Sequence, residues 1–590
     1  MPSTKALPLS KAFDSEVVSK EISNFDSEAV KYKAAEAPDE KFRPFRLQHG
    51  IYGQRQAGVQ MIRVKVPAGL LNAAQLRALA DVAERHAPLK IGHITTRQNF
   101  QFHFIQLEDI AQVMNIINAV GLTSREACGN TVRNITGSYF SGLCPNEPFD
   151  SAPYAIAAFE YFLRKPENQN LPRKFKISFS GCTDVECTQN PINDIAATSV
   201  VRDVNGQTVK GFRIEVGGGL GASPNSAALV TEFVSVDEYL SLIEAVIAYF
   251  NRDGERKNRD RARIKFLLRK VGIEKFNEEV FKLWEGGLRK TISVGPVADV
   301  LPVPSNILSP ASVSGPEAVS SDKVYQEWLK YNVKTQRQIG FNIAIVKLFL
   351  GDLTVEQFRT LADLAEKFGD GTMRTMNNQN ICFAWIQTAL LPKLYATLKA
   401  TGLGDAGADH ISDVTSCPGG DSCNLAFTKS RGLGRLLTRH LQDTYGNAED
   451  LEGAHIKISG CPNSCGQHHI GTIGFFGGVQ STPDKTHIPS YSLLLGGGIG
   501  PEGAKFGKIT LRLPAANCPE AVDRLIALYR EQKQNSETMV SFVRRVDPAL
   551  VKERLKDLTV IDPKNEKIFI DLGDTEKFKF SGIGQGECAV

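Results

Sequence analysis

Four cysteines in two short turns are the residues of this chain with the most specific chemistry. Cys417 and Cys423 form a C-x5-C pair in DVTSCPGGDSC, and Cys461 and Cys465 form a C-x3-C pair in KISGCPNSCGQHH. Glycine, proline, serine and asparagine surround both pairs, and these residues favour turns and let the backbone approach a bound group closely. Four thiolates so placed can hold a zinc ion or an iron–sulfur cluster. Paired cysteines of structural zinc sites are usually separated by two to four residues, so the wider first pair favours the cluster. Four unrelated buried cysteines are the weaker alternative.

Two lysines on one strand form a second feature suited to chemistry. In LPRKFKISF (171–179) the alternation predicts a strand with Phe175, Ile177 and Phe179 toward the core and Lys174 and Lys176 on the opposite face. At a strand rise of roughly 3.3 Å per residue, the two lysines are about 7 Å apart along the backbone. Like charges so placed are unfavourable unless an anion lies near them, which predicts an anion site. The alternative is a pair of edge-strand charges that discourage aggregation.

The two cysteine spacings, their order and the GCPNSC turn resemble the sirohaem and 4Fe-4S sulfite/nitrite reductase family, and most nearly its ferredoxin-dependent assimilatory sulfite reductases. The resemblance extends over about residues 46 to 530. It implies that all four cysteines ligate a 4Fe-4S cluster, since four thiolates are the general ligand set of such clusters. It also implies that the Cys465 sulfur bridges the cluster to the iron of a sirohaem.

The same resemblance implies roles for cationic and polar residues. Reduction of an oxyanion needs fixed positive charge to hold it and to supply protons, which arginine and lysine provide. The residues that match the substrate-anion positions are Arg63, Arg133, Lys174 and Lys176. Those that match sirohaem-contacting positions are Thr96, Arg97, Gln101, His103, Arg173, Asn463 and Cys465. Because sirohaem carries eight carboxylates, further cations are expected around it. Taken singly, an arginine on a strand is usually a surface residue, and His103 in an aromatic strand is typical of a satisfied core histidine.

The elements that must position these residues occur twice. The first copy is predicted to begin with a strand that has Ile62, Val64 and Val66 on one face. A helix at 72–86 follows, and then an aromatic strand with Phe100, Phe102 and Phe104 on one face. Almost three hundred residues later the pattern returns. The matched pairs include Gly69 with Gly351, Leu79 with Leu361, Asp81 with Asp363 and Gln98 with Gln379. Further on, KFKISFSGC (174–182) returns loosely as HIKISGC (455–461).

The two copies differ where the chemistry is expected. Arg63 aligns with Ile345, and Arg97 aligns with Asn378. The first module therefore supplies positive charge, and the second supplies the metal ligands.

These repeats predict an α+β protein of two tandem pseudo-symmetric modules. By the family resemblance, two ferredoxin-like half-domains join in one lobe and two α/β lobes bind sirohaem. We expect an N-terminal arm at 1–45, half-domains at 46–122 and 335–404, a first sirohaem-binding lobe with its linker at 123–320, a 4Fe-4S/sirohaem lobe at 405–546 and a C-terminal tail at 547–590. The strongly basic segment 251–270 is interpreted as a solvated helix, and the tail with Cys588 is given no role.

Composition restricts the class of protein. The 590 residues are 42% hydrophobic and 23% charged, which is ordinary for a soluble globular chain of several domains. No apolar run reaches membrane-spanning length and the first residues hold no signal core, so we expect a cytoplasmic protein that does not bind membranes. Eleven cysteines, clustered and odd in number, indicate metal chemistry in a reducing compartment. The net charge of +4 permits an acidic partner without indicating nucleic acid, and we expect a monomer.

One sequence position, Lys176, helps to choose between sulfite and nitrite as the substrate. Nitrite-reducing relatives tend to carry asparagine where this chain has Lys176, and a second lysine suits sulfite, which is largely a dianion near neutral pH. The favoured function is six-electron reduction of sulfite to sulfide, with reduction of nitrite to ammonia as the alternative. No flavin or nicotinamide module is evident, so electrons would come from ferredoxin or another low-potential donor protein. A non-catalytic metal-stabilised binding protein would explain the cysteines but not the paired lysines.

Other cysteines are harder to interpret. Tyr52 and Cys128 match positions that form a side-chain crosslink near the active site in some relatives. Cys182 and Cys187 repeat the Cys461/Cys465 turn at C-x4-C. Their upstream partners would be Cys128 and Cys144, whose wide spacing predicts a degenerate site without a cluster.

Overall fold

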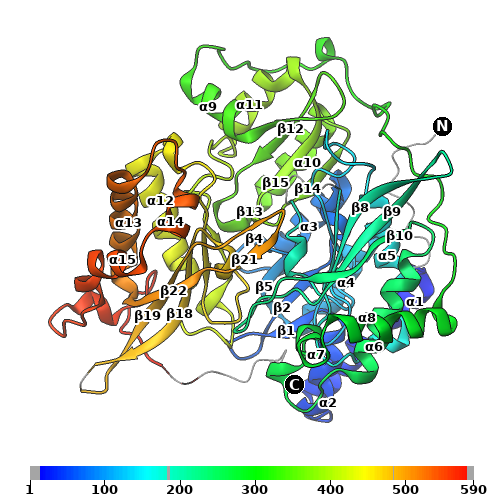
Figure 1. Ribbon diagram of the computed structural model, residues 1–590, viewed down its shortest axis with the longest axis horizontal. Coiled ribbons are helices and arrows are strands. Elements are labelled where there is room, and N and C mark those ends of the chain that lie inside the picture. Colours follow the sequence, from blue (N-terminus) through cyan, green and yellow to red (C-terminus); the bar gives the residue numbers. More distant parts are fainter. Residues whose placement is uncertain (1–12, 182–186, 483, 581, 583–590) are drawn as a thin grey trace.

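The computed structural model describes residues 13–181, 187–482, 484–580 and 582. In this part of the chain, four five-stranded sheets form the frame of the molecule (Figure 1). Two of the sheets belong to the half-domains, and the other two belong to the lobes that follow them. None of the helices in the described ranges is long and apolar enough to cross a membrane.

The first half-domain is a sheet of strand order β1-β2-β5-β4-β13 packed against two helices. Ile62 and Val64 of β2 are fully buried, as the alternation predicts, while Arg63 between them lines a cavity. The first helix begins at a capping box in which Asn72 and Gln75 bond each other's backbone. The elements are β1 (Ile51–Gly53), β2 (Val59–Val64), β4 (Ile91–Ile94), β5 (Phe100–Gln106), α3 (Ala73–His86) and α4 (Ile110–Ala119).

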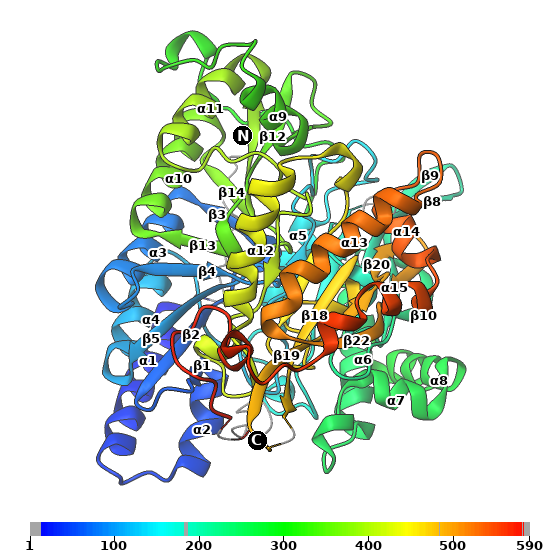
Figure 2. The same cartoon turned by 90° about the vertical axis from the view of Figure 1, so that its left-hand side faces the viewer.

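The second half-domain repeats this arrangement and exchanges one strand with the first. Its sheet has the order β11-β12-β15-β14-β3, in which β3 (Leu70–Asn72) comes from the first module. In return, β13 (Asp352–Thr354) pairs with β4. Each half-domain completes the sheet of the other, and α3 packs beside α10 (Figures 1 and 2). The remaining elements are α9 (Lys323–Asn332), β11 (Val333–Thr335), β12 (Phe341–Val346), α10 (Val355–Phe368), β14 (Thr372–Thr375), β15 (Ile381–Gln387) and α11 (Leu391–Ala400).

Two buried glutamines at equivalent positions hold this junction together. Gln98 Nε2 donates to the carbonyls of Gly137 at 3.0 Å and Thr375 at 2.8 Å, and Gln98 Oε1 accepts from the Gly137 N–H at 3.0 Å. Its counterpart Gln379 accepts from the Ser416 N–H at 2.8 Å. Since Gly137 and Ser416 belong to the two lobes, each glutamine ties the half-domains to a lobe.

The two lobes share one topology. In each sheet, two pairs of parallel neighbours are followed by two antiparallel strands. The loose repeat of 174–182 in 455–461 lies on the equivalent strands β7 and β17. The α+β fold with two pseudo-symmetric modules is confirmed.

The first lobe contains β6 (Thr136–Gly137), α5 (Ala152–Phe162), β7 (Ile177–Ser180), β8 (Ile195–Val204), β9 (Gln207–Val216), β10 (Ala228–Ser235), α6 (Tyr239–Asp253), α7 (Ile264–Val271) and α8 (Ile273–Leu283). The second lobe contains β16 (Thr415–Ser416), α12 (Ser430–Tyr445), β17 (Ile456–Ser459), β18 (Ile473–Ser481), β19 (His487–Leu495), β22 (Lys508–Pro514) and α13 (Cys518–Gln532), with a separate hairpin of β20 (Gly498–Gly500) and β21 (Gly503–Lys505).

Both ends of the chain pack on this frame. The arm forms α1 (Ser15–Lys33) and α2 (Asp39–Gln48), and its fully buried Phe25 joins the core of the half-domains. The second lobe ends with α14 (Met539–Arg545), and the tail forms α15 (Pro548–Arg554), followed by short 3₁₀ turns and one isolated bridge between Ile570 and Lys577. Cys588 lies outside the described residues.

Two local expectations are wrong. The basic segment 251–270 is not one solvated helix: α6 ends at Asp253, and α7 starts only at Ile264, with buried Arg263 and Lys265 on either side of that residue. The alternation of the aromatic strand breaks at Phe104, whose φ of +63° forms a bulge opposite β2.

Replacing Gln98 with alanine is expected to destabilise the protein by about 2–4 kcal/mol, because three buried backbone groups lose their hydrogen-bond partner. Thermal unfolding of the cofactor-loaded protein measures the change. Gln534→Ala, at an exposed position, is the control and is expected to leave the midpoint unchanged. A Gln98→Ala midpoint equal to that of the wild type would contradict the role given to this side chain.

Candidate active site

A cavity of about 610 Å³ lies where the first half-domain meets both lobes. Its walls come from β2, β4 and β5, from loops of the first lobe and from the two cysteine turns. Every residue that the sequence placed in a substrate, sirohaem or cluster role lines it. These residues are Arg63, Thr96, Arg97, Gln101, His103, Arg133, Arg173, Lys174, Lys176, Cys417, Cys423, Cys461, Asn463 and Cys465. Their individual roles stay predictions.

The two cysteine turns meet because the strands before them are parallel neighbours. Cys417 follows β16 and Cys461 follows β17, so both turns leave the same edge of the sheet. The carboxyl ends of parallel strands are where open α/β sheets bind ligands. The Gly460 N–H donates to Cys417 Sγ at 3.3 Å, and the Ser430 hydroxyl lies 3.3 Å from the same sulfur. The Cys417 sulfur thus already accepts one backbone hydrogen bond.

Glycine is required at two positions of these turns. Gly419 has a φ of +57°, and a Cβ there would lie 2.2 Å from Ser430 Oγ. A Cβ at Gly466 would lie 1.8 Å from the Ile458 carbonyl oxygen. The glycines noted in the sequence let the two turns approach each other.

Cys417 and Cys461 are too protected from water to ionise readily on their own. Burial raises the pKa of Cys417 and of Cys461, and the neighbouring Cys465 raises both further. A bound cation removes this penalty, because metal binding releases the thiol protons. Among the described residues, no three His, Cys, Asp or Glu side chains are grouped closely enough to hold a single metal ion. Four cysteines that border a shared cavity without converging on one point fit a cluster better than a zinc ion.

Two arginines of the cavity wall are held by backbone oxygens. Arg63 Nη1 and Arg133 Nη1 each donate to the Ala127 carbonyl at 3.0 Å. Arg133 Nη2 lies 3.4 Å from Tyr52 Oη, and Arg63 Nη1 lies 3.6 Å from Cys128 Sγ. Tyr52 and Cys128 therefore contact the same pair of arginines, and their crosslink stays a prediction.

The paired lysines precede β7 and line the cavity, whereas Phe175 is fully buried on the other side. Burial lowers the pKa of Lys176 well below its usual value, and the nearby Arg97 lowers it further. Asp194 accepts from the Lys176 N–H at 2.8 Å, which holds this segment in place. An anion in the cavity would favour the charged form of Lys176.

The cavity has the charge and the unpaired polar atoms that a polycarboxylate ring requires. Nine arginine and lysine side chains line it, and Asp260 is the one acid among the described lining residues. Both ring nitrogens of His103 and Nε of Arg97 are buried there without a hydrogen-bond partner. Burial lowers the pKa of His103 to about 3, so its ring is neutral. The interpretation of His103 as a satisfied core histidine is wrong, and the residues present fit sirohaem.

Four further basic residues line this cavity without having been given a role from the sequence: His93, Arg259, Arg263 and Lys265. Arg263 makes a two-pronged ion pair with Asp194, with N–O distances of 2.7 Å. Lys265 Nζ donates to the Leu220 carbonyl at 2.7 Å, in the turn that follows VGGG. The one signal in the sequence was the density of cations before 270. Which of them turn inward depends on how α7 packs.

The equivalent place in the second half-domain is filled by apolar side chains. Instead of the polar residues on β2 and β5, the second copy has Ile345, Cys382 and Ala384, all buried in one cluster. In the first lobe, Ser138 and not Cys128 is equivalent to Cys417, because both follow the matched strands β6 and β16. Ser138 Oγ lies 2.6 Å from Cys187 Sγ, and Cys182 lies outside the described residues.

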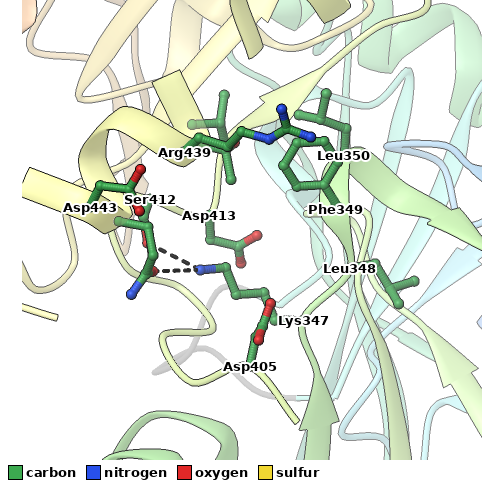
Figure 3. A pocket seen from close by; sticks show the side chains of 12 residues that line it. Lys347, Leu348, Phe349, Leu350, Asp405, Ser412, Asp413, Arg439 and Asp443 are labelled. Carbon is green, nitrogen blue, oxygen red and sulfur yellow. Dashed lines mark hydrogen bonds between the residues drawn. The ribbon is translucent and has the colours of Figure 1, made fainter. Parts of the chain in front are cut away.

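A second cavity, of about 230 Å³, lies between the second half-domain and α12 (Figure 3). Lys347 Nζ extends across it and donates to Ser412 Oγ at 3.1 Å. Asp413 accepts from Asn380 Nδ2 at 2.6 Å, and burial raises the pKa of Asp413 to about 6. None of the described residues that line this cavity is a cysteine, so it is separate from the cluster turns.

The raised pKa of Asp413 predicts a pH effect on stability. The folded protein binds this proton more tightly than the unfolded chain, whose carboxyl has an ordinary pKa of 3.8. Stability is therefore lost as the pH rises from about 4 to about 6, by about 2–3 kcal/mol. Asp413→Asn is expected to raise the thermal unfolding midpoint at pH 8 and to give no gain near pH 4. Asp443→Asn, at the exposed rim of the same cavity, should behave like the wild type at both pH values. A pH-independent effect of Asp413→Asn would contradict this account.

The predicted role of the four cysteines as cluster ligands can be tested by measuring the iron content of variants. Cys417→Ser is expected to lose most of its iron and the electron paramagnetic resonance signal of a reduced cluster, because one ligand is gone. Cys518→Ser is the matched control, since Cys518 is fully buried at the start of α13 and does not line the cavity. Equal iron loss in both variants would show that a general packing defect is responsible.

Comparison with known proteins agrees with this geometry. The model of the nitrite and sulphite reductase 4Fe-4S domain matches residues 128–286 and 407–559, and that of the nitrite/sulfite reductase ferredoxin-like half domain matches 52–120 and 334–401. A solved structure of the Mycobacterium tuberculosis NirA protein superposes with a TM-score of 0.73 at 26% identity, and covers 88% of this chain and 92% of that one.

Some relatives similar to this chain are named nitrite reductases, and others are named sulfite reductases. The assimilatory ferredoxin-dependent nitrite reductase of Haloferax mediterranei is 28% identical over 91% of both chains. The ferredoxin sulfite reductase 1 of Mycolicibacterium paratuberculosis is also 28% identical, over 84% of this chain and 87% of its own length. The ferredoxin–nitrite reductase of Synechococcus elongatus is 29% identical, over 83% of this chain and 90% of its own length. The matched domains span more than half of the chain, which belongs to the nitrite and sulphite reductase family of oxidoreductases.

Proposed function

We propose that this protein reduces sulfite to sulfide by six electrons, with sirohaem and a 4Fe-4S cluster as its cofactors. The observation that carries the proposal is that four cations, Arg63, Arg133, Lys174 and Lys176, line the same cavity as the four cysteines. A metal site with fixed positive charge beside it is what the reduction of a small oxyanion requires.

The four cysteines would hold the cluster, and Cys465 is suited to a second task. Cys417 and Cys461 are buried, whereas Cys465 is exposed to the cavity, so its sulfur is available to a second metal. Thr96 Oγ1 donates to the Cys465 carbonyl at 3.0 Å, which fixes the first half-domain against this turn. When bound, the two cofactors supply a metal for the central atom of the substrate and a low-potential store of electrons.

The arginines would orient the anion. Arg63 is held by the Ala127 carbonyl, and Gln101, turned with its amide oxygen toward Arg63, accepts from Arg63 Nε at 3.1 Å. Arg133 is held in the same way, by the Gly129 carbonyl at 2.6 Å. Guanidinium groups fixed before the substrate arrives stabilise negative charge without further reorganisation. Their planar forks also suit the oxygen atoms of an oxyanion.

The lysines would supply protons. Each oxygen that leaves the substrate as water needs two protons, and an ammonium group can donate one and be recharged from solvent. Because burial and neighbouring cations lower the pKa of Lys176, this group releases its proton more readily than an exposed lysine. Lys174, two residues earlier on the same face, would act beside it.

Charge favours sulfite over nitrite. A dianion gains more than a monoanion from a second lysine whose charge is otherwise disfavoured by burial. Nitrite reduction to ammonia is the second candidate, and the names of the Haloferax and Synechococcus relatives support it. Those names also support ferredoxin as the electron donor.

Steady-state reduction of sulfite and of nitrite, side by side with reduced ferredoxin or methyl viologen, tests the proposal. A sirohaem spectrum and a higher kcat/KM for sulfite are expected. A clear preference for nitrite would overturn the substrate assignment, and a colourless protein free of iron would overturn the enzymatic function.

The role of Lys176 predicts a shift in preference. Lys176→Asn is expected to lower kcat/KM for sulfite by about 10- to 100-fold, the value of a hydrogen bond to a charged group, and to lower that for nitrite less. Lys290→Asn, which replaces an exposed lysine of the same lobe, is expected to change neither. An equal loss with both substrates would show that Lys176 does not select between them.

A further inference from the structure

A short strap connects the two cysteine turns. It comprises residues 427–430, which follow the Cys423 turn and end at the first residue of α12. The Phe427 N–H donates to the Gly460 carbonyl at 2.8 Å, next to Cys461, and the Thr428 carbonyl accepts from Gly420 at 2.9 Å. At its end, Ser430 Oγ donates to the Cys417 carbonyl at 2.8 Å and lies 3.3 Å from the sulfur. The position of the strap therefore sets the spacing of the turns.

The C-terminal tail contacts this strap. Asp571 Oδ2 accepts from the Lys429 N–H at 2.6 Å, and Asp571 is only 3% exposed. Lys429 Nζ forms an ion pair with Asp574 at 2.9 Å. The ring of Phe580 stacks on that of Phe427, with centroids 5.9 Å apart. Three of the tail's side chains thus bind the strap.

The backbone of the tail lies directly against the first turn of α12. A Cβ at Gly432 would lie 1.7 Å from the Leu572 carbonyl oxygen, so only glycine permits this approach. Figure 2 shows the C-terminal segment in red, looping beside β19 and α12. This segment lies beyond residue 559, where the matched family domain ends.

We propose that residues 566–580 form the outer wall of the cluster cradle, and that Asp571 is the positioning residue that keeps the strap closed over the cluster turns. The proposal rests on the 4Fe-4S cluster of the family and not on the choice between sulfite and nitrite. The other carboxylate oxygen of Asp571 accepts from the Leu572 N–H at 2.9 Å, within the tail itself.

The physical argument concerns local opening. The Lys429 N–H is one of the donors at the start of α12 that have no acceptor within the helix, and Asp571 accepts from it instead. A buried N–H that loses a charged acceptor favours conformations in which water reaches it. Opening of the strap would bring water and small chelators to Cys417, and with them a route for iron to leave.

The test is the rate at which the purified holoenzyme, kept anaerobic, releases iron to a coloured ferrous chelator without any substrate. Asp571→Ala is expected to release iron roughly tenfold faster than the wild type, from the loss of one hydrogen bond to a charged group. Asp571→Asn keeps an oxygen that accepts from the Lys429 N–H and is expected to stay within about twofold of the wild type. Glu576→Ala changes an exposed acid of the same tail and is the matched control.

Three results would overturn the proposal: Asp571→Ala releasing iron at the wild-type rate, Asp571→Asn releasing it as fast as Asp571→Ala, or Glu576→Ala showing the same increase. A chain that ends at Asn565 must release iron at least as fast as Asp571→Ala. Should Asp571→Ala not accumulate, Phe580→Ala replaces it, with a smaller increase expected and an unchanged rate counting against the proposal. Failure of the sulfite assignment would leave all of these rates unaffected.

Discussion

The burial of positive charge in one cavity is the constraint on which the rest of this structure depends. Nine arginines and lysines line the cavity, and among its described lining residues only Asp260 is acidic. Taking charged groups out of water is costly, and burial lowers the pKa of Arg97 to about 9 and that of Lys176 well below its usual value. Backbone carbonyls and Asp194 offset part of this cost, and bound anions would offset the rest. The buried positive charge of the cavity can thus be compensated by the carboxylates of sirohaem and by an oxyanion.

The pseudo-symmetry shows how such a site can arise in one copy alone. The backbone of the two half-domains is nearly the same, down to the bulges at Phe104 and Trp385, both with a φ of +63°. The side chains differ: the second copy carries Ile345, Cys382 and Ala384 and buries them in an apolar cluster. An apolar cluster needs no ligand, whereas burying the cations of the first copy costs free energy unless anions compensate them. The exchange of β3 and β13 then requires both copies, because each completes the other's sheet.

The junction of half-domains and lobes also sets the place of the cluster. Gln98 joins the half-domains to the first lobe, and Thr96, two residues before it, bonds the Cys465 turn of the second lobe. The arginine wall and the cysteine cradle are therefore held by the same loop. On the far side of the cradle, the tail holds the strap through Asp571. A cluster placed there would be fixed from both sides by segments far apart in the sequence.

The sequence by itself determined the repeat, and it predicted the four cysteines as cluster ligands and the two lysines as a pair, because each of these is a local pattern. Spacing within a turn brings Cys417 and Cys423 to one cavity, and the alternation of 171–179 puts Lys174 and Lys176 on one face, although β7 itself begins only at Ile177. The tertiary structure alone decided which cations of 251–270 turn inward, that His103 faces a cavity, that two strands are exchanged and that the tail docks on the strap. These outcomes depend on the packing of segments hundreds of residues apart, where a local pattern carries no information about the partner. Arg263 shows the difference: its charge was visible in the sequence, but only the position of Asp194 explains its burial.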